Sequence, residues 1–323
     1  MAIKMHPQLN FLAFLVILAV ADGFCQSRFG KRTNQLRPLE QSSRADANIL
    51  DDSAQQNAAK MFQSPVLGPP ADTKPDYDRI VGPLGKTIDN LYLKVFREKL
   101  TEQVGSDSAL PATDFKAIIE LAATMNKRFT SRLEIQQRAQ NVLRAIFPSW
   151  LPKSYAILFA RPFPQFSARM NAWATKVAGT WLMGECEIND VEFDGGMIGK
   201  NQGLLVKRCR FLEESGCASI CVNSCKVPTQ NFFIKDMGLP LTMEPNYETF
   251  ECQFSFGKTP NRNSEIIAKS TPCLKRCPTA GSLRSFHDGS ATDGVGDGAC
   301  QFMDDDEPFL ALIKNLDVVP QNS

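Results

Sequence analysis

Apolar side chains recur at helical spacing through the first half of the folded part of the chain. The helices that this spacing predicts cover about 77–95, 113–124 and 166–183. Another helix is expected to begin after Ser131, because Ser131 and Glu134 form the Ser-x-x-Glu pattern of a capping box. Pro148 and Pro152 are expected to end it. The pattern therefore predicts an N-terminal helical layer.

The pattern changes after about residue 200. Residues 203–211 predict a strand, residues 217–225 have cysteines at helical spacing, and Pro228 can begin another helical turn. Apolar and polar side chains then alternate over 250–256, as on a half-buried strand. The apolar members of this alternation are Phe250, Cys252, Phe254 and Phe256. The predicted fold class is α+β, with the helical layer followed by a small sheet and a cysteine-rich helix.

The N-terminus is typical of a targeting segment. An apolar run from Phe11 to Ala21 is shorter than the roughly 20 residues that span a bilayer comfortably, so it fits a signal peptide. We predict a signal peptide over 1–23, which leaves Phe24 at the new terminus, and a transit peptide with a disordered linker over 24–76. Together they resemble the bipartite presequences of algae with secondary plastids. Localisation in the plastid (chloroplast) is expected, and simple secretion is the alternative.

The rest of the chain is predicted to form one α+β domain over 77–280 and a flexible acidic extension over 281–323 with a short helix. The 323 residues include 36 Lys and Arg and 35 Asp and Glu, so a protein built to coat nucleic acid is excluded and no nucleic-acid partner is expected. The hydrophobic fraction of 43% excludes general disorder.

Histidine is nearly absent, and this restricts the metal chemistry. The chain has 2 His, one of them in the extreme N-terminus, which excludes any site that needs two or more imidazoles. Metal or thiol chemistry must then rely on the 10 cysteines. Cys217, Cys221 and Cys225 are spaced i, i+4 and i+8, so they are expected to share one helix face, where three thiols can converge on a single soft centre.

A later pair, Cys273-x3-Cys277 followed by Pro278, is similar to the end of a ferredoxin cysteine run. The spacing alone leaves three possibilities open. The thiols could bind a metal or cluster, zinc included, could form the disulfides of an oxidised scaffold, or could be buried free thiols acting as small apolar side chains. The last interpretation is preferred for Cys252 and Cys300.

Six segments together carry a resemblance to a known family. They are Gly179–Gly184 (GTWLMG), Lys207–Ser215 (KRCRFLEES), Cys217–Phe233, Gly238–Tyr247 (GLPLTMEPNY), Cys252–Gly257 and Pro272–Pro278. With them the chain resembles the plastid β-carotene isomerase family of strigolactone biosynthesis (the Dwarf-type isomerase, C-terminal domain). The resemblance covers about 155–280, and the acidic extension lies outside the family core.

The resemblance implies an iron-dependent cis/trans isomerisation of a carotenoid double bond, from all-trans to 9-cis β-carotene or in a related polyene. The cofactor would be iron, either mononuclear or in an iron–sulfur cluster, which can exchange single electrons with the polyene. The expected ligands are Cys217, Cys221, Cys225 and Cys277, with Cys273, Cys209 and Cys186 in reserve.

A carotenoid substrate further implies apolar contacts and peripheral contact with a membrane. The expected substrate-binding residues are Trp173, Trp181, Phe211, Phe232, Phe233, Met243 and Phe254, for each of which core packing is the alternative. Metal-free addition of a thiolate or thiyl radical is an alternative mechanism. Two alternative functions also stay open, namely an iron- or iron–sulfur-binding redox protein without a substrate and a secreted disulfide scaffold that binds a partner.

Overall fold

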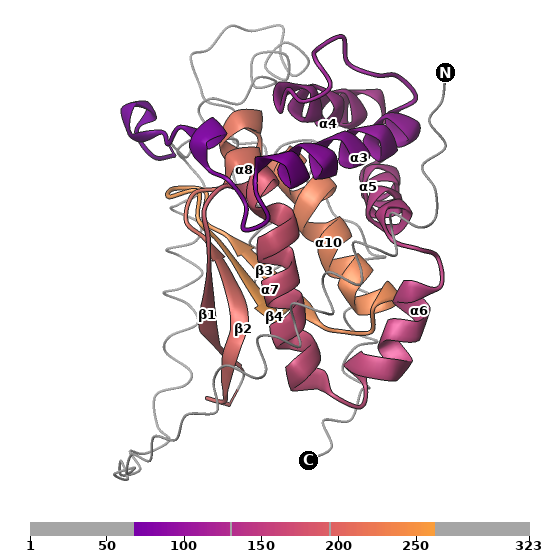
Figure 1. The fold of residues 1–323 in the computed structure, drawn as a ribbon, viewed down its shortest axis with the longest axis vertical. Coiled ribbons are helices and arrows are strands. Elements are labelled where there is room, and N and C mark those ends of the chain that lie inside the picture. The colour runs from indigo at the N-terminus through magenta and orange to yellow at the C-terminus, as the bar shows by residue number, and fades with distance from the viewer. Residues whose placement is uncertain (1–67, 130, 194, 262–323) are drawn as a thin grey trace, which may run out of the picture. The chain divides into compact units, whose positions relative to one another are not determined.

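The computed structural model describes residues 68–129, 131–193 and 195–261, all of which belong to one compact unit. Helices cover one face of an antiparallel sheet in this unit (Figure 1), so the predicted α+β class is confirmed. The predicted presequence, the Cys273 and Cys277 pair and the C-terminal extension lie outside the described residues.

The N-terminal part is helical, as the spacing of apolar residues predicts. Its elements are η1 (Ala71–Thr73), η2 (Tyr77–Arg79), α3 (Lys86–Val104), α4 (Lys116–Arg128), α5 (Arg132–Ile146), α6 (Leu151–Tyr155), η3 (Ala156–Ala160) and α7 (Pro164–Met183). The N-cap half of the predicted capping box is confirmed, because the Ser131 side chain accepts a hydrogen bond from the Glu134 N–H at 3.4 Å at the start of α5. The Glu134 carboxylate accepts hydrogen bonds from Arg138.

Two predicted boundaries in the N-terminal part were wrong. The first helix begins at Lys86 rather than near Tyr77, because Gly85 has a φ of 88°, which a helix cannot include. Pro152 does not end a helix but lies in the first turn of α6. The N–H groups of a first turn make no hydrogen bond within the helix, so a proline without an N–H is tolerated there. The α6–η3 segment that follows was not predicted.

The C-terminal part combines the sheet with a long helix. Its elements are β1 (Cys186–Glu192), β2 (Ile198–Val206), α8 (Arg210–Ser215), α9 (Ala218–Ile220), η4 (Cys221–Lys226), α10 (Val227–Asn231), η5 (Phe232–Asp236), β3 (Leu241–Pro245) and β4 (Cys252–Phe256). The segments α9, η4, α10 and η5 follow one another without a break, and η4 and η5 are π-helical. Insertions of this kind occur often at functional sites.

The strands are antiparallel and lie in the order β1-β2-β4-β3. Leu204 of β2 and Met243 of β3 flank Phe254 of β4. The apolar members of the β4 alternation face the helices, as the contact of Phe256 with Phe233 of η5 shows. Phe250 lies outside the strand with a φ of 62°. The strand predicted over 203–211 instead ends at Val206, since the chain turns there into α8.

The helix α7 packs across β1, β2 and β4 (Figure 1). The continuous segment from α9 to η5, which we call the long helix, packs against β3 through α10. The helices α4 and α5 pack on α3, which also contacts α7, and form a second layer over the core. In the part of the chain that the structure describes, no helix combines the length and apolar character needed to cross a bilayer.

Candidate functional site

Four thiols around α8, the long helix and β4 lie near enough to influence one another's pKa values, and we call them the thiol cluster: Cys209, Cys221, Cys225 and Cys252. Cys209 caps α8, where its sulfur accepts a hydrogen bond from the Leu212 N–H at 3.5 Å. Cys221 and Cys225 belong to the π-helical η4, and Cys252 begins β4. All six cysteines of the described residues are free thiols, which contradicts a disulfide scaffold built on them.

Burial keeps the thiol cluster protonated. It raises the pKa of Cys209 to about 11 and that of Cys221 to about 12, and it raises the pKa values of Cys225 and Cys252 well above the ordinary range. The thiolate form of each of Cys221, Cys225 and Cys252 would also be repelled by the thiolate forms of its neighbours, which raises these pKa values further. At neutral pH the four side chains are therefore uncharged, and uncharged thiols are weak nucleophiles.

A buried lysine adjoins the cluster and was not predicted from the sequence. The Lys226 side chain is only 2% exposed and partly counteracts the rise in the pKa values of Cys221 and Cys252. Its position in the cysteine run was the available signal, because a lysine on the buried face of an apolar helix needs a polar or charged neighbour.

The described residues alone do not form a metal site. Within 68–129, 131–193 and 195–261, no three Cys, His, Asp or Glu side chains are grouped closely enough to hold an ion. Cys217 lies before α9 in an extended conformation, so only Cys221 and Cys225 of the predicted triplet share the helical segment. The structure instead brings Cys209 and Cys252 to them from other elements.

Several predicted substrate residues join a continuous run of ring contacts, which we call the aromatic series: Phe147, Phe232, Phe233, Phe256 and Phe254. Successive ring centroids are 5.4, 5.6, 5.3 and 6.5 Å apart. The series ends on β4, where Phe254 and Cys252 are two residues apart and so face the same side. Phe256 and Phe147 were not predicted as substrate residues. The alternation in β4 could have added Phe256 to that set, but no pattern in the sequence indicates the contact of Phe147 with Phe232.

The other predicted substrate residues are placed differently. Met243 is buried beside Phe254 in the sheet register, and Phe211 is buried on α8. Trp173 is half-buried on α7. Trp181, also on α7, contacts Phe96 and Phe115 instead of the aromatic series.

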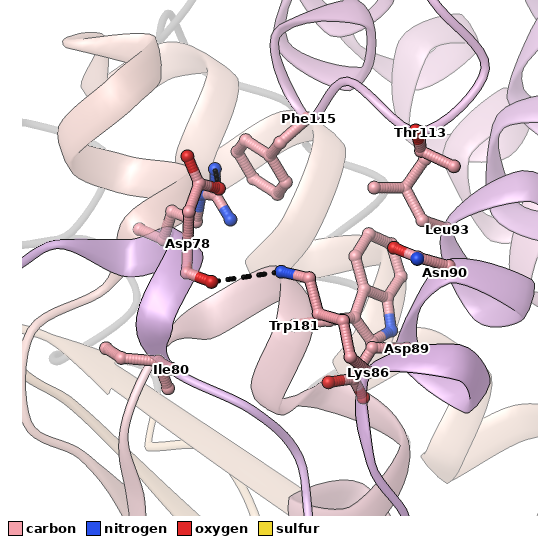
Figure 2. A pocket seen from close by; sticks show the side chains of 10 residues that line it. Asp78, Ile80, Lys86, Asp89, Asn90, Leu93, Thr113, Phe115 and Trp181 are labelled. Atoms are coloured by element: carbon pink, nitrogen blue, oxygen red, sulfur yellow. Dashed lines mark hydrogen bonds and ion pairs between the residues drawn. The ribbon is translucent and has the colours of Figure 1, made fainter.

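The pocket beside Trp181 is small and polar. Figure 2 shows Trp181 and Phe115 together with Asp78 and Lys86, whose Nζ donates a hydrogen bond to the Asp78 carbonyl at 3.1 Å. Its volume is about 30 Å³, room for one or two water molecules, and the larger groove that adjoins it has a mainly polar and charged lining. Neither space suits a long hydrocarbon.

The charged residues of the KRCRFLEES segment fasten the N-terminal part of the unit to α8. Glu213 accepts hydrogen bonds from Arg208 at 2.6 and 2.8 Å and from the Tyr77 hydroxyl at 2.5 Å. Arg208 also donates to the Thr73 and Pro70 carbonyls. This buried clamp, defined by Tyr77, Arg208 and Glu213, gives the segment a structural role beside the thiol that it contains, Cys209.

Comparison with known proteins agrees with the predicted resemblance. Residues 181–265 match the C-terminal domain of the D27-like β-carotene isomerases, a range that contains all four thiols of the cluster and the four strands. The chain is 27% identical over 202 residues to the chloroplastic β-carotene isomerase D27 of Arabidopsis thaliana, which is 62% of this chain and 74% of that protein.

The enzyme of the same name from Medicago truncatula is 27% identical over 223 residues, which is 63% of this chain and 86% of that protein. No solved structure matches the chain significantly.

Proposed function

Since the chain is a member of the D27-like β-carotene isomerase family, we propose that it catalyses cis/trans isomerisation of a carotenoid double bond, from all-trans to 9-cis β-carotene or in a related polyene. The observation that carries the proposal is the meeting of the aromatic series with the thiol cluster on β4, within the segment that matches the family.

Each set of side chains has a separate task in this proposal. The aromatic series would border a long apolar polyene, since its rings carry no polar atom and Phe147 and Phe233 are partly exposed. The thiol cluster would supply the reactive group next to the double bond. The helical layer over the core would exclude water. The carbon–carbon double bond of the polyene rotates once its bond order is lowered.

The ionisation of the thiols bears on which chemistry is proposed. Addition of a thiolate to the polyene needs an ionised sulfur, and burial disfavours that form in Cys221 and Cys209. A bound metal ion reverses this preference, because a coordinating thiol loses its proton. We therefore propose iron as the cofactor, with no His required.

Of the expected ligands, Cys217, Cys221 and Cys225 belong to the described residues, and Cys209 and Cys186 are the described members of the reserve. Because the described donors do not complete a site, this part of the proposal requires Cys273 and Cys277, which lie outside the described residues. Thiols are soft donors that suit iron, which supports the proposal.

Activity is tested with the purified full chain and all-trans β-carotene in detergent micelles, with the isomers resolved by chromatography. We expect a cis isomer to form with the wild type, and its rate of formation to fall by about tenfold or more in Cys221→Ser. Cys25→Ser is the matched control, since Cys25 belongs to the predicted presequence, and it should keep the wild-type rate. Absence of any isomer with the wild type would exclude the proposed reaction.

Iron is tested separately, by elemental analysis of the same proteins. We expect iron in the wild type and in Cys25→Ser, and a loss of iron in Cys277→Ser. An active protein that contains no iron would reject the cofactor while leaving the reaction intact. Coloured, iron-containing protein without isomerase activity would favour the redox protein without a substrate.

We further propose localisation in the plastid, because both relatives are named as chloroplastic and the N-terminus resembles a presequence. A fluorescent protein fused to residues 1–76 should enter plastids, and export from the cell would favour secretion instead.

A further inference from the structure

We propose that the segment from Trp150 to Phe166, which runs through α6 and η3 into the start of α7, docks on the surface of a lipid bilayer that contains anionic lipids. We define the apolar end patch by Trp150, Ile157, Leu158, Phe163 and Phe166. The proposal rests on the proposed function, because a carotenoid is soluble in lipid and the enzyme must take it from there. It goes further by naming the surface that makes the contact and the chemistry of the lipid.

The patch is unusual for its exposure. Ten large apolar side chains of the described residues are exposed, and five of them lie within 150–166. Ile157, Phe163 and Leu158 are 66%, 58% and 57% exposed. Single exposed apolar residues are common on protein surfaces, but a group of this size is typical of an interaction site.

The patch is held rigidly, so its exposure is a property of the fold. The Tyr155 hydroxyl lies 2.6 Å from the Ser167 Oγ and accepts a hydrogen bond from the Asn171 amide at 2.7 Å. These buried contacts join α6 to α7 and fix the turn between them. Leu151 and Ala160 of the same segment are buried, whereas Ile157 and Leu158 between them are exposed.

The charge around the patch matches an anionic surface. The sequence has no Asp or Glu between Glu134 and Glu185, and it has six Lys and Arg there. Three of these basic residues are exposed beside the patch: Lys153, Arg161 and Arg169. Exposed apolar and aromatic side chains bordered by Lys and Arg are typical of interfacial segments that bind anionic membranes.

The same charge argues against a second copy of the chain as the occupant. A symmetric dimer places the same patch on both subunits, so these basic side chains would face one another. The β1–β2 turn also exposes Met197 and Ile198, but it follows Glu192, and we leave it outside the patch.

The patch also lies at the start of the aromatic series. Trp150 follows three residues after Phe147, the ring that stacks on Phe232 at a centroid distance of 5.4 Å. Figure 1 shows the turn between α6 and α7 at the end of the unit away from α4 and α8. An apolar substrate that leaves a bilayer at the patch would therefore meet the aromatic series before it meets the thiol cluster.

Binding is tested by flotation of the full chain with vesicles of phosphatidylcholine and with vesicles of equal phosphatidylcholine and phosphatidylglycerol. The double variant Phe163→Ser/Phe166→Ser should lower binding to the mixed vesicles by about tenfold or more. The matched control is Val81→Ser/Leu91→Ser, which removes two exposed apolar side chains elsewhere and should change binding by less than about twofold. Equal binding of the two double variants would overturn the proposal.

The charge is tested with Lys153→Gln/Arg161→Gln. Each lost charge should weaken binding to the mixed vesicles by about fivefold and leave binding to neutral vesicles unchanged. Because the apolar run Phe11 to Ala21 could itself enter lipid, a second measurement reports on the patch alone. Brominated lipids should quench the fluorescence of the wild type and should fail to do so in Trp150→Phe. Quenching that persists unchanged in this variant would also overturn the proposal.

Activity separates this inference from the proposed function. The Phe163→Ser/Phe166→Ser variant should isomerise β-carotene in detergent micelles at the wild-type rate and lose activity only when the substrate is embedded in vesicles. If the wild type is inactive both in micelles and in vesicles, the proposed function fails. The flotation of the double variants with vesicles still tests the docking proposal in that case. A variant that binds vesicles normally but no longer self-associates would assign the patch to a second copy and overturn the proposal.

Discussion

The buried clamp at Glu213 makes a quantitative prediction about stability. Glu213→Gln keeps the size of the side chain but removes its charge, and the new amide must point an N–H group at Arg208, because both Glu213 oxygens accept hydrogen bonds from Arg208. The two Arg208 bonds, at 2.6 and 2.8 Å, lose the charge on their acceptor, and the Glu213 side chain that accepts them is only 3% exposed.

Breaking a buried ion pair typically costs about 3–5 kcal/mol, because the remaining charge stays buried without its partner. Arg208 retains hydrogen bonds to the Thr73 and Pro70 carbonyls, so we expect a cost at the lower end, about 3 kcal/mol in the free energy of unfolding at pH 7. Glu187→Gln is the control. Its exposed carboxylate lies 3.6 Å from Lys207, and its loss should cost less than about 0.5 kcal/mol.

The pH dependence tests the cause. Burial alone would raise the pKa of Glu213, but the hydrogen bonds from Arg208 and Tyr77 outweigh it and hold the pKa below its usual value. The clamp therefore stabilises the fold above the unfolded pKa of about 4.3 and loses this contribution as the pH falls through the lower folded pKa.

Urea unfolding of both proteins from pH 7 to pH 3 should thus show a difference that shrinks on acidification. A difference that stays constant with pH, or one below about 0.5 kcal/mol at pH 7, would refute the electrostatic explanation.

Three further stability predictions use the same unfolding measurement. Phe232→Ala should cost about 3–5 kcal/mol, because this ring is 1% exposed and packs between Phe147 and Phe233 in the aromatic series; a cost below about 1 kcal/mol would mean that the neighbouring side chains fill the cavity. Gly203→Ala should lower stability by about 1–3 kcal/mol, since its Cβ would overlap the Asn189 and Gln253 amides that bond to each other across it; an unchanged midpoint would contradict this. Ser131→Ala should cost about 1 kcal/mol, and Ser131→Asp, which keeps the cap, should cost less.

The sequence alone determined the features that depend on near neighbours in the chain. The N-cap at Ser131, the helical stripe of α7 and the alternation in β4 each involve interactions within a few residues, so periodicity and residue type were sufficient. The near absence of His and the segments that resemble the family were also evident from the sequence without the structure. Helix boundaries were predicted wrongly at Gly85 and Pro152. A glycine can lie within a helix or just before its start, and a proline can end a helix or occupy its first turn, so the residue type alone does not place the boundary.

Only the tertiary structure decided which groups meet. Cys209 and Cys252 join Cys221 because α8 and β4 pack against the long helix, and no spacing in the sequence encodes that contact. Burial then sets the ionisation of the thiols, since desolvation depends on everything packed around them. The apolar run over 150–166 could equally have been core. Its side chains reach solvent because the buried contacts of Tyr155 turn α6 and α7 together, and such contacts between elements exist only once the chain has folded.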